Sequence, residues 1–535
     1  MDKYMASRVD QDTPRVNPDV ARGLAVKHLP HAEEWIDNIW RSVAKDFPPG
    51  LEYVGGRRCT PGEELIIEPR KKNDRKIVDI AVSQIYMMRY DFKFMGKPLT
   101  PRYMYLPFVG IAGSIILGGS RFFISPVLSD VVLSYELNNV FVRLLRDKFS
   151  IYRENHTVIV NGQRDTTSVA WSLIYHVNKD QKREKKISSA NTSLVHYLLC
   201  KYGFAGMFQR FTKTNPVIGK AEINTETYPE EDWYIFSTYN FGLGRYGASR
   251  NTTSPTPVRV AVRKTEMTPL VRNLLIGFFY VTDHFSTRVD PAYVNNPRLW
   301  KVLLGHLLFG FACSEGKLHD DADEHINSLS EYIDSFMQHK FRSIGLDVPD
   351  IFAFFAIAIE KINEWIMSAP SKINSLYDKE LSILYDVLIS MTSSIHNLHF
   401  KLKTAAKKGL TEKEIENLMN TFIKAKSIIS LTRTPPGVSN MSYSGDNAVM
   451  KITTVMVPQR GHQGDDGDME ALSDPARHLS FSHAEIGNYN NLPKSNPTGD
   501  GRVNPCIILD SNGKTIRNPR FDELRTQIGE MIKHN

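Results

Sequence analysis

The sequence predicts an α+β protein with a mixed β-rich N-terminal region, a central all-helical region and an irregular C-terminal region with short hairpins. Short apolar runs punctuated by glycine and proline dominate residues 51–265, and long amphipathic segments dominate residues 266–434. Serine, asparagine, glycine and aspartate are abundant after residue 435. A length of 535 residues is typical of about two to four domains.

Residues 1–50 are expected to form a helical N-terminal segment. The spacing of apolar residues in His31–Asp46 predicts one helix, and Phe47-Pro48-Pro49-Gly50 ends it because proline and glycine interrupt helices. Residues 1–23 carry mixed charge and no apolar run, so we expect no signal peptide and an intracellular protein.

Residues 51–265 are expected to form a mixed β-rich domain. Asn161-Gly162 follows Thr157–Val160 and predicts a hairpin, because this dipeptide supplies the positive φ angles of a type I′ turn. Amphipathic spacing predicts helices at Asn139–Phe149 and Ser193–Phe211. Strands are predicted where short apolar runs lie between glycines and prolines, at Leu65–Glu68, Ile77–Ile85, Ile115–Leu117, Phe122–Ile124 and Val258–Val262.

Residues 266–434 are expected to form a helical domain, arranged as a bundle or an array. The two apolar runs Leu106–Gly119 and Ile351–Ile359 are both shorter than the roughly 20 residues of a membrane-spanning helix, so we expect them to be core segments. Helices are predicted at Leu270–Phe279, Trp300–Phe311, His319–Phe341, Ile351–Met367, Ile373–Leu402 and Thr411–Ile429.

Residues 435–535 are expected to form a loop-rich C-terminal region with hairpins and a short helix. The composition changes at Thr434-Pro435-Pro436-Gly437, beyond which polar and glycine residues predominate. The expected elements are a hairpin at Val449–Val457, a second hairpin whose strands Cys506–Leu509 and Lys514–Ile516 flank Asp510–Gly513, and a helix at Phe521–Lys533.

The cysteines argue against a zinc ribbon or a redox dithiol. The four, Cys59, Cys200, Cys313 and Cys506, lie more than a hundred residues apart, and no two have CxxC spacing. We therefore expect reduced thiols with no metal or redox role.

Two acidic clusters are candidates for metal binding. In His319–His325, His319 and Asp323 would share one face of a helix and could bind a divalent ion, but acids near the positive end of a helix dipole explain the cluster more simply. Gly464-Asp465-Asp466-Gly467-Asp468 resembles a polymerase metal turn, although its polar flanks favour a solvated loop. Phosphate-loop, dinucleotide, serine-hydrolase and zinc-protease motifs are missing, so we expect no catalytic residue, no metal and no cofactor.

Basic clusters are the strongest functional signal, although the net charge is only +7. Lysine and arginine in loops can neutralise nucleic-acid phosphates, and aromatic residues nearby can stack on unpaired bases. An acidic partner or a purely solubilising role would use the same residues. The predicted DNA-binding residues are Arg57, Arg58, Arg70, Lys71, Lys72, Arg75, Lys76, Lys182, Arg183, Lys185 and Lys186.

The stretch Gly110–Gly162 reads GIAGSIILGGSRFFISPVLSDVVLSYELNNVFVRLLRDKFSIYRENHTVIVNG. It resembles the fifth subunit of the non-virion multisubunit RNA polymerase of phiKZ-type giant bacteriophages. The resemblance implies a sigma-like role in promoter recognition or opening. It also implies β- and β′-like polymerase chains and DNA as partners, no membrane, and the host cytoplasm as the location.

The catalytic D-F-D-G-D loop of multisubunit polymerases is absent from this sequence, so catalysis would lie on other chains. We therefore expect a non-catalytic, DNA-engaging subunit. Two alternatives remain open. One is a structural protein of a phage particle, and the other is a metal-dependent nuclease that uses His319, Asp320 and Asp323.

Overall fold

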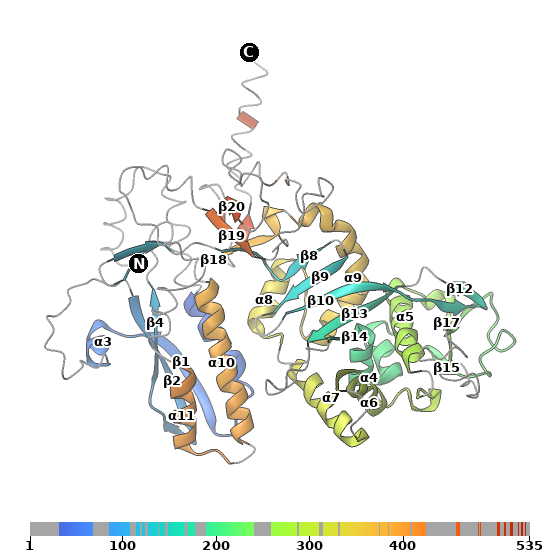
Figure 1. Cartoon of the computed structure of the whole chain (residues 1–535), viewed down its shortest axis with the longest axis horizontal. Coiled ribbons are helices and arrows are strands. Elements are labelled where there is room, and N and C mark those ends of the chain that lie inside the picture. The colour runs from blue at the N-terminus through green and yellow to red at the C-terminus, as the bar shows by residue number, and fades with distance from the viewer. Residues whose placement is uncertain are drawn as a thin grey trace. The chain divides into compact units, whose positions relative to one another are not determined.

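The computed structural model describes most of residues 32–423, with gaps that include 68–84, 108–113, 177–188 and 240–257. Beyond residue 423 it describes only short stretches, among them 456–460, 500–502, 508–509 and 514–516. The chain divides into two compact units (Figure 1). Unit 1 comprises Met1–Val132, Asp334–Gly345 and Ser371–Asn535, and unit 2 comprises Leu133–Ile333 and Leu346–Pro370.

Unit 1 is built around a four-stranded antiparallel sheet. β2 (Ile85–Phe94) pairs with β1 (Leu51–Arg58), β3 (Lys97–Pro98) and β4 (Arg102–Pro107). Residues 32–44 form a helix whose Trp40 is fully buried and meets Phe92 edge-on, with ring centroids 5.0 Å apart. Alternate residues of β2, including Tyr90 and Phe92, are therefore apolar and buried, as expected of a half-buried strand.

Two helices of unit 1 lie beside this sheet (Figure 1). They are α10 (Tyr385–Ala406) and α11 (Glu412–Phe422). α11 begins with a capping box in which the Thr411 hydroxyl accepts from the Glu414 backbone N–H. Its Glu416 carboxylate accepts a 2.6 Å hydrogen bond from the Thr100 hydroxyl, which joins α11 to the start of β4.

A second four-stranded sheet in unit 1 joins distant parts of the chain, in the order β18-β7-β19-β20. The β7–β19 pair is parallel and the other two pairs are antiparallel. Its strands are β7 (Val127–Asp130), β18 (Lys379–Ser382), β19 (Met456–Arg460) and β20 (Asp500–Arg502). The smaller elements are α3 (Pro61–Ile67), α8 (Ser335–Ser343), the 3-10 helix η4 (Leu376–Asp378), and the hairpins β5 (Ser114–Leu117) with β6 (Ser120–Phe123) and β21 (Ile508–Leu509) with β22 (Thr515–Ile516).

Two buried ion pairs meet on β18. Lys379 pairs with Asp130, its cross-strand neighbour on β7, and the side chains are 3% and 10% exposed. The Lys340 ammonium of α8 lies 2.6 Å from both carboxylate oxygens of Glu380, with side chains 8% and 6% exposed. Because successive residues of a strand point to opposite faces, the two pairs tie β18 to β7 and to α8.

Unit 2 contains two five-stranded antiparallel sheets. The first has the order β14-β13-β10-β9-β8, and the second has the order β12-β11-β16-β17-β15. Their strands are β8 (Leu133–Tyr135), β9 (Asn139–Arg143), β10 (Lys148–Asn155), β11 (Val158–Val160), β12 (Gln163–Asp165), β13 (Val169–His176), β14 (Ser189–Ser193), β15 (Val217–Gly219), β16 (Trp233–Thr238) and β17 (Arg259–Arg263).

The helices of unit 2 supply most of its aromatic core. Phe278 meets Phe204 and Trp300 with ring centroids 4.8 and 5.8 Å away, and all three side chains are at most 1% exposed. The helices are α4 (Leu194–Phe211), α5 (Pro269–His284), α6 (Pro297–Phe309), α7 (Glu315–Leu329), α9 (Ile351–Lys372, of which residues 351–370 belong to unit 2), η2 (Lys264–Glu266) and η3 (Pro291–Tyr293).

The α+β prediction is confirmed, and so are several local elements. Asn161 and Gly162 have φ angles of 48° and 78° at the turn that joins β11 to β12, as the Asn-Gly signal predicts. The helix at residues 32–44, α4, β17 and the β21–β22 hairpin also lie where they were expected. None of the described helices is long and apolar enough to cross a membrane.

Two predicted elements have the wrong type. The strand expected at Leu65–Glu68 is replaced by α3, because Thr60 caps a helix that begins at Pro61. The helix expected at Asn139–Phe149 is replaced by β9 and the start of β10, which pair with each other. Val140 and Val142 are both fully buried, and this alternation fits a strand.

Two predicted helices have the wrong extent. His319–Phe341 is divided into α7 and α8 because the Asp334 carboxylate accepts from the Met337 backbone N–H and starts a new helix. Ile373–Leu402 contains η4 and β18 before α10 begins at Tyr385. Residues 424–429, 449–455 and most of Phe521–Lys533 lie outside the described residues, as do residues 77–84.

Candidate nucleic-acid interface

Only Arg57 and Arg58 of the predicted DNA-binding residues are described by the structure, and both lie at the end of β1. The nine others lie outside the described residues: Arg70, Lys71, Lys72, Arg75, Lys76, Lys182, Arg183, Lys185 and Lys186. The first five of these nine belong to the segment 68–84, which connects α3 to β2. This basic segment therefore follows the end of α3 and precedes the start of β2 in the sequence.

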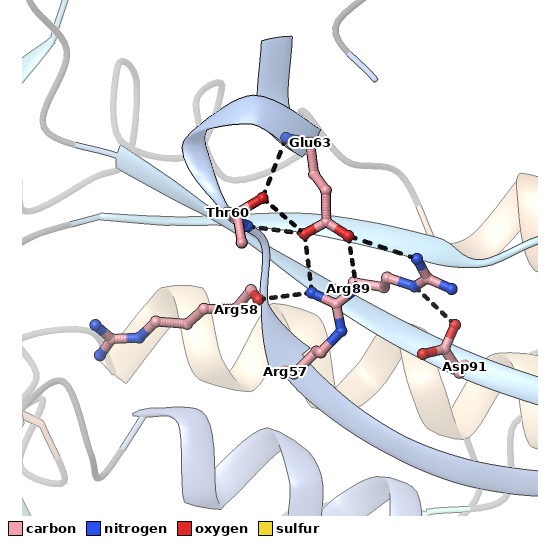
Figure 2. Close-up of polar contacts among 6 residues, drawn as sticks. All are labelled: Arg57, Arg58, Thr60, Glu63, Arg89 and Asp91. Atoms are coloured by element: carbon pink, nitrogen blue, oxygen red, sulfur yellow. Dashed lines mark hydrogen bonds and ion pairs between the residues drawn. The ribbon is translucent and has the colours of Figure 1, made fainter. Parts of the chain in front are cut away.

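Arg57 lies directly opposite Arg89 in the β1–β2 pair, where two like charges would repel each other. The Glu63 carboxylate offsets this repulsion. Arg57 donates to both Glu63 oxygens over 2.9 and 2.6 Å, and a guanidinium nitrogen of Arg89 lies 3.8 Å from the same carboxylate (Figure 2). Arg89 also donates a 2.8 Å hydrogen bond to Asp91. The two arginines and two carboxylates form one charge-balanced network.

Glu63 reaches this network from α3, and α3 is fixed to the sheet through the side chains of Glu63 and Glu64. Glu63 accepts a 2.8 Å hydrogen bond from the Thr60 backbone N–H, and its own N–H donates to the Thr60 hydroxyl over 3.3 Å, so the two residues form a capping box (Figure 2). The Glu64 carboxylate accepts from the Met87 backbone N–H at 2.8 Å. Thr60 and Glu63 have the T-x-x-E spacing of a capping box, so the sequence carried a readable signal for α3.

The hydrogen bond from Arg57, with that from Thr60, lowers the pKa of Glu63 to about 2. The same contact raises the pKa of Arg57 above its ordinary value. Because the folded-state pKa of Glu63 is lowered, its ion pair stabilises the fold above the ordinary carboxyl pKa of 4.5 and loses that contribution as the pH falls toward about 2. The Glu63 carboxylate is therefore charged at neutral pH.

Arg58 belongs to a separate ion pair. It donates a 2.6 Å hydrogen bond to Glu33 in the helix at residues 32–44, and its guanidinium carbon lies 4.7 Å from the centre of the Tyr86 ring. The side chains of Arg57 and Arg58 are 48% and 46% exposed, so both can be reached from solvent. A phosphate would nevertheless have to compete with Glu63 or Glu33 for them.

Substitutions at Glu63 test whether the network fixes α3. Glutamine at this position can keep the capping box, whereas alanine removes both the capping box and the contact with Arg57. We expect amide hydrogen exchange in α3 to be slowest in the wild type, faster in Glu63→Gln and fastest in Glu63→Ala. Equal exchange rates in all three proteins would show that α3 does not depend on Glu63.

The cluster His319–His325 lies within α7. Asp323 receives a 2.6 Å hydrogen bond from Lys301, which lowers the pKa of Asp323. The His319 ring lies 3.0 Å from Asp320, and His325 lies 3.3 Å from the hydroxyl of Tyr197. Since α7 begins at Glu315, the first turn precedes His319, and the pairing with Lys301 explains Asp323 better than the helix dipole does.

No group of three or more histidine, cysteine, aspartate or glutamate side chains suited to a metal ion occurs among the residues that the structure describes. His319, Asp320 and Asp323 do not form such a group. The acidic turn Gly464–Asp468 lies outside the described part of the chain.

The chain matches a known protein family over nearly its whole length. A family model described as non-virion RNA polymerase subunit matches residues 2–530. No curated protein matches the chain.

Proposed function

Because this chain belongs to the family of non-virion RNA polymerase subunits, we propose that it is the DNA-engaging subunit of a phage multisubunit RNA polymerase and acts in promoter recognition or opening. The single observation that carries the proposal is the family match over nearly the whole chain. A polymerase subunit works in a complex with other polymerase subunits. We propose that these are β- and β′-like chains of the same phage, in the host cytoplasm.

The basic segments support the DNA-engaging part of the proposal. Arg70, Lys71, Lys72, Arg75 and Lys76 follow α3 closely in the sequence, and Asp74 is the only acid among residues 70–76. Cations of this kind release counterions when they neutralise phosphates, which gives affinity without sequence specificity. The anchoring of α3 by Glu63 would fix one end of this segment against β1 and β2. Arg57 and Arg58 would serve first as anchors, and as phosphate ligands only after exchanging their carboxylate partners.

We propose that catalysis resides on other chains. Nucleotide addition in multisubunit polymerases depends on carboxylates that hold magnesium in a fixed geometry. This sequence lacks the D-F-D-G-D loop that supplies them, and its Asp465-Asp466 pair has polar flanks rather than the hydrophobic strands of a polymerase metal turn. The family match favours a polymerase subunit over a virion structural protein and over a metal-dependent nuclease.

Native mass spectrometry of the tagged chain, purified from infected cells, tests the proposal. We expect it to recover an assembly that contains β- and β′-like chains and synthesises RNA, whereas the isolated chain with Mg²⁺ should synthesise none. Recovery of the chain only with virion components would contradict the proposal, as would RNA synthesis by the isolated chain that disappears in Asp465→Asn with Asp466→Asn.

A further inference from the structure

A kink in α4 brings together side chains that a straight helix would keep apart. Gly203 has φ 68° and ψ −178° inside the helix. The chain restarts as a helix because the Phe204 N–H donates to the Val294 carbonyl at 3.1 Å and the Ala205 N–H donates to the Asn295 side chain at 2.9 Å. A Cβ atom at Gly203 would lie 2.4 Å from the Asn295 carbonyl oxygen, so both the backbone angle and the close approach require glycine.

The kink places Tyr202 against Phe211, with ring centroids 5.6 Å apart in an edge-on arrangement. Residues nine positions apart in a straight helix would be about 13 Å apart along its axis. Tyr202 also meets the buried Phe352 of α9 edge-on, at 6.1 Å. The guanidinium carbon of Arg210 lies 5.2 Å from the Tyr202 ring and 5.9 Å from the Phe211 ring.

We call Lys201, Tyr202, Arg210, Phe211 and Lys213 the α4 patch. The two rings are half-buried, and the three cations are exposed. Within the described part of the chain, none of the three cations pairs with a carboxylate. The Asp350 carboxylate acts electrostatically on Tyr202, but it already accepts from the Ala353 N–H at 2.8 Å and caps α9. The patch is therefore positively charged.

Lys213 adds a sign of function to this patch. Its φ angle is 59°, in the left-handed region that glycine adopts without strain after a helix. A lysine in this conformation indicates a functional role for its side chain, because strained residues concentrate at functional sites. The helix dipole explains a cation at the end of α4 but not the ordered rings beside it.

We infer that the α4 patch docks a carboxylate-rich segment of another subunit of the polymerase, an inference that rests on the proposed function. Tyrosine and arginine are enriched among the residues that dominate protein interfaces. Arg210 is pre-organised by the two rings, so little side-chain freedom is lost when its guanidinium binds a carboxylate in the bidentate manner. A nucleic-acid strand fits less well, because Arg210 and Phe352 already contact the Tyr202 ring on which a base would stack.

The test compares two charge reversals in the full chain, co-expressed with the other polymerase subunits. Arg210→Glu with Lys213→Glu should reduce recovery of the other subunits by about tenfold or more, as expected for interface residues of this kind. The matched control is Arg263→Glu with Lys264→Glu. These exposed cations also lie over aromatic rings, 5.3 Å from the centre of the Trp233 ring and 5.2 Å from the centre of the Tyr234 ring. They belong to β17 and η2 instead of α4, and their reversal should leave recovery of the other subunits unchanged. Circular dichroism should show that both variants are folded.

Carbodiimide cross-linking identifies the occupant. The reagent activates a carboxylate, and attack by a lysine amine forms an amide bond and releases the reagent as its urea, so a cross-link from Lys201 or Lys213 to a partner aspartate or glutamate is expected in the wild-type complex. Equal recovery with both variants, or protection of the patch by DNA instead of protein, would overturn the inference. If the wild-type chain recovers no polymerase subunit, the proposed function itself fails.

Discussion

Reversal of Arg70, Lys71, Lys72, Arg75 and Lys76 to glutamate should weaken promoter DNA binding by the assembled polymerase about a hundredfold or more at 50 mM salt. If each of the five cations neutralises one phosphate, their loss should make the slope of log K against log salt concentration shallower by about 4 to 5. The difference between wild type and variant should therefore shrink as salt rises. Filter binding or fluorescence anisotropy over a salt series measures both quantities.

A charge-conserving variant controls for effects on folding and assembly. Arg70→Lys with Arg75→Lys keeps every positive charge in the segment and should keep the salt slope close to that of the wild type. The second basic segment, Lys182, Arg183, Lys185 and Lys186, can be reversed separately to compare the two. Unchanged affinity and unchanged slope in the five-residue variant would remove residues 70–76 from the DNA interface.

Asp130→Ala is expected to destabilise unit 1 by about 3–5 kcal/mol, the usual cost of removing one partner of a buried ion pair. The Lys379 ammonium would stay buried at 3% exposure after the loss of its carboxylate, with the Ile373 carbonyl 3.1 Å away as a much weaker acceptor. Urea unfolding followed by the fluorescence of the protein's tryptophans would report the loss as a lower free energy of unfolding.

The double variant Asp130→Leu with Lys379→Met is the matched control. Replacing both charges with apolar side chains of similar size leaves no unpaired buried charge at this position and should recover most of the stability lost in Asp130→Ala. A double variant as unstable as Asp130→Ala would mean that packing at this position, rather than the uncompensated charge, sets the cost. Wild-type stability in Asp130→Ala would show that the Lys379–Asp130 pair contributes little to unit 1.

Elements with local determinants could be predicted from the sequence. The Asn161-Gly162 turn requires only two residues with positive φ, and α4 begins where the Ser193 hydroxyl accepts from the Val195 N–H. Both signals lie within a few residues of the structure that they specify. The general α+β character depends on the same short-range periodicities.

Elements that depend on distant partners could not be predicted in the same way. β18 lies in a region with helical periodicity, and it forms a strand because Lys379 meets Asp130, 249 residues away. The apolar spacing of Asn139–Phe149 predicts a helix across β9, whereas the pairing of β9 with β10 buries Val140 and Val142. In both cases tertiary pairing outweighs the local pattern.

The candidate interface shows the same division. The basic clusters could be found from composition, and Thr60 and Glu63 carry a recognisable capping spacing. The contact of Glu63 with Arg57 and Arg89 could not be predicted from the sequence. It depends on the strand register that places the two arginines opposite each other. The sequence does not predict the α4 patch, because it shows Gly203 only as a glycine within a helix. The kink at Gly203, which brings Tyr202 against Phe211, is visible only in the structure.

The most direct measurement compares transcription by the polymerase with and without this chain on two templates. One carries a duplex promoter, and the other has a single-stranded tail that allows initiation without promoter recognition. We expect the assembly lacking this chain to transcribe the tailed template at a rate close to that of the complete enzyme but not to initiate at the promoter. Initiation at the promoter by the assembly without this chain would contradict a role of this chain in promoter recognition or opening.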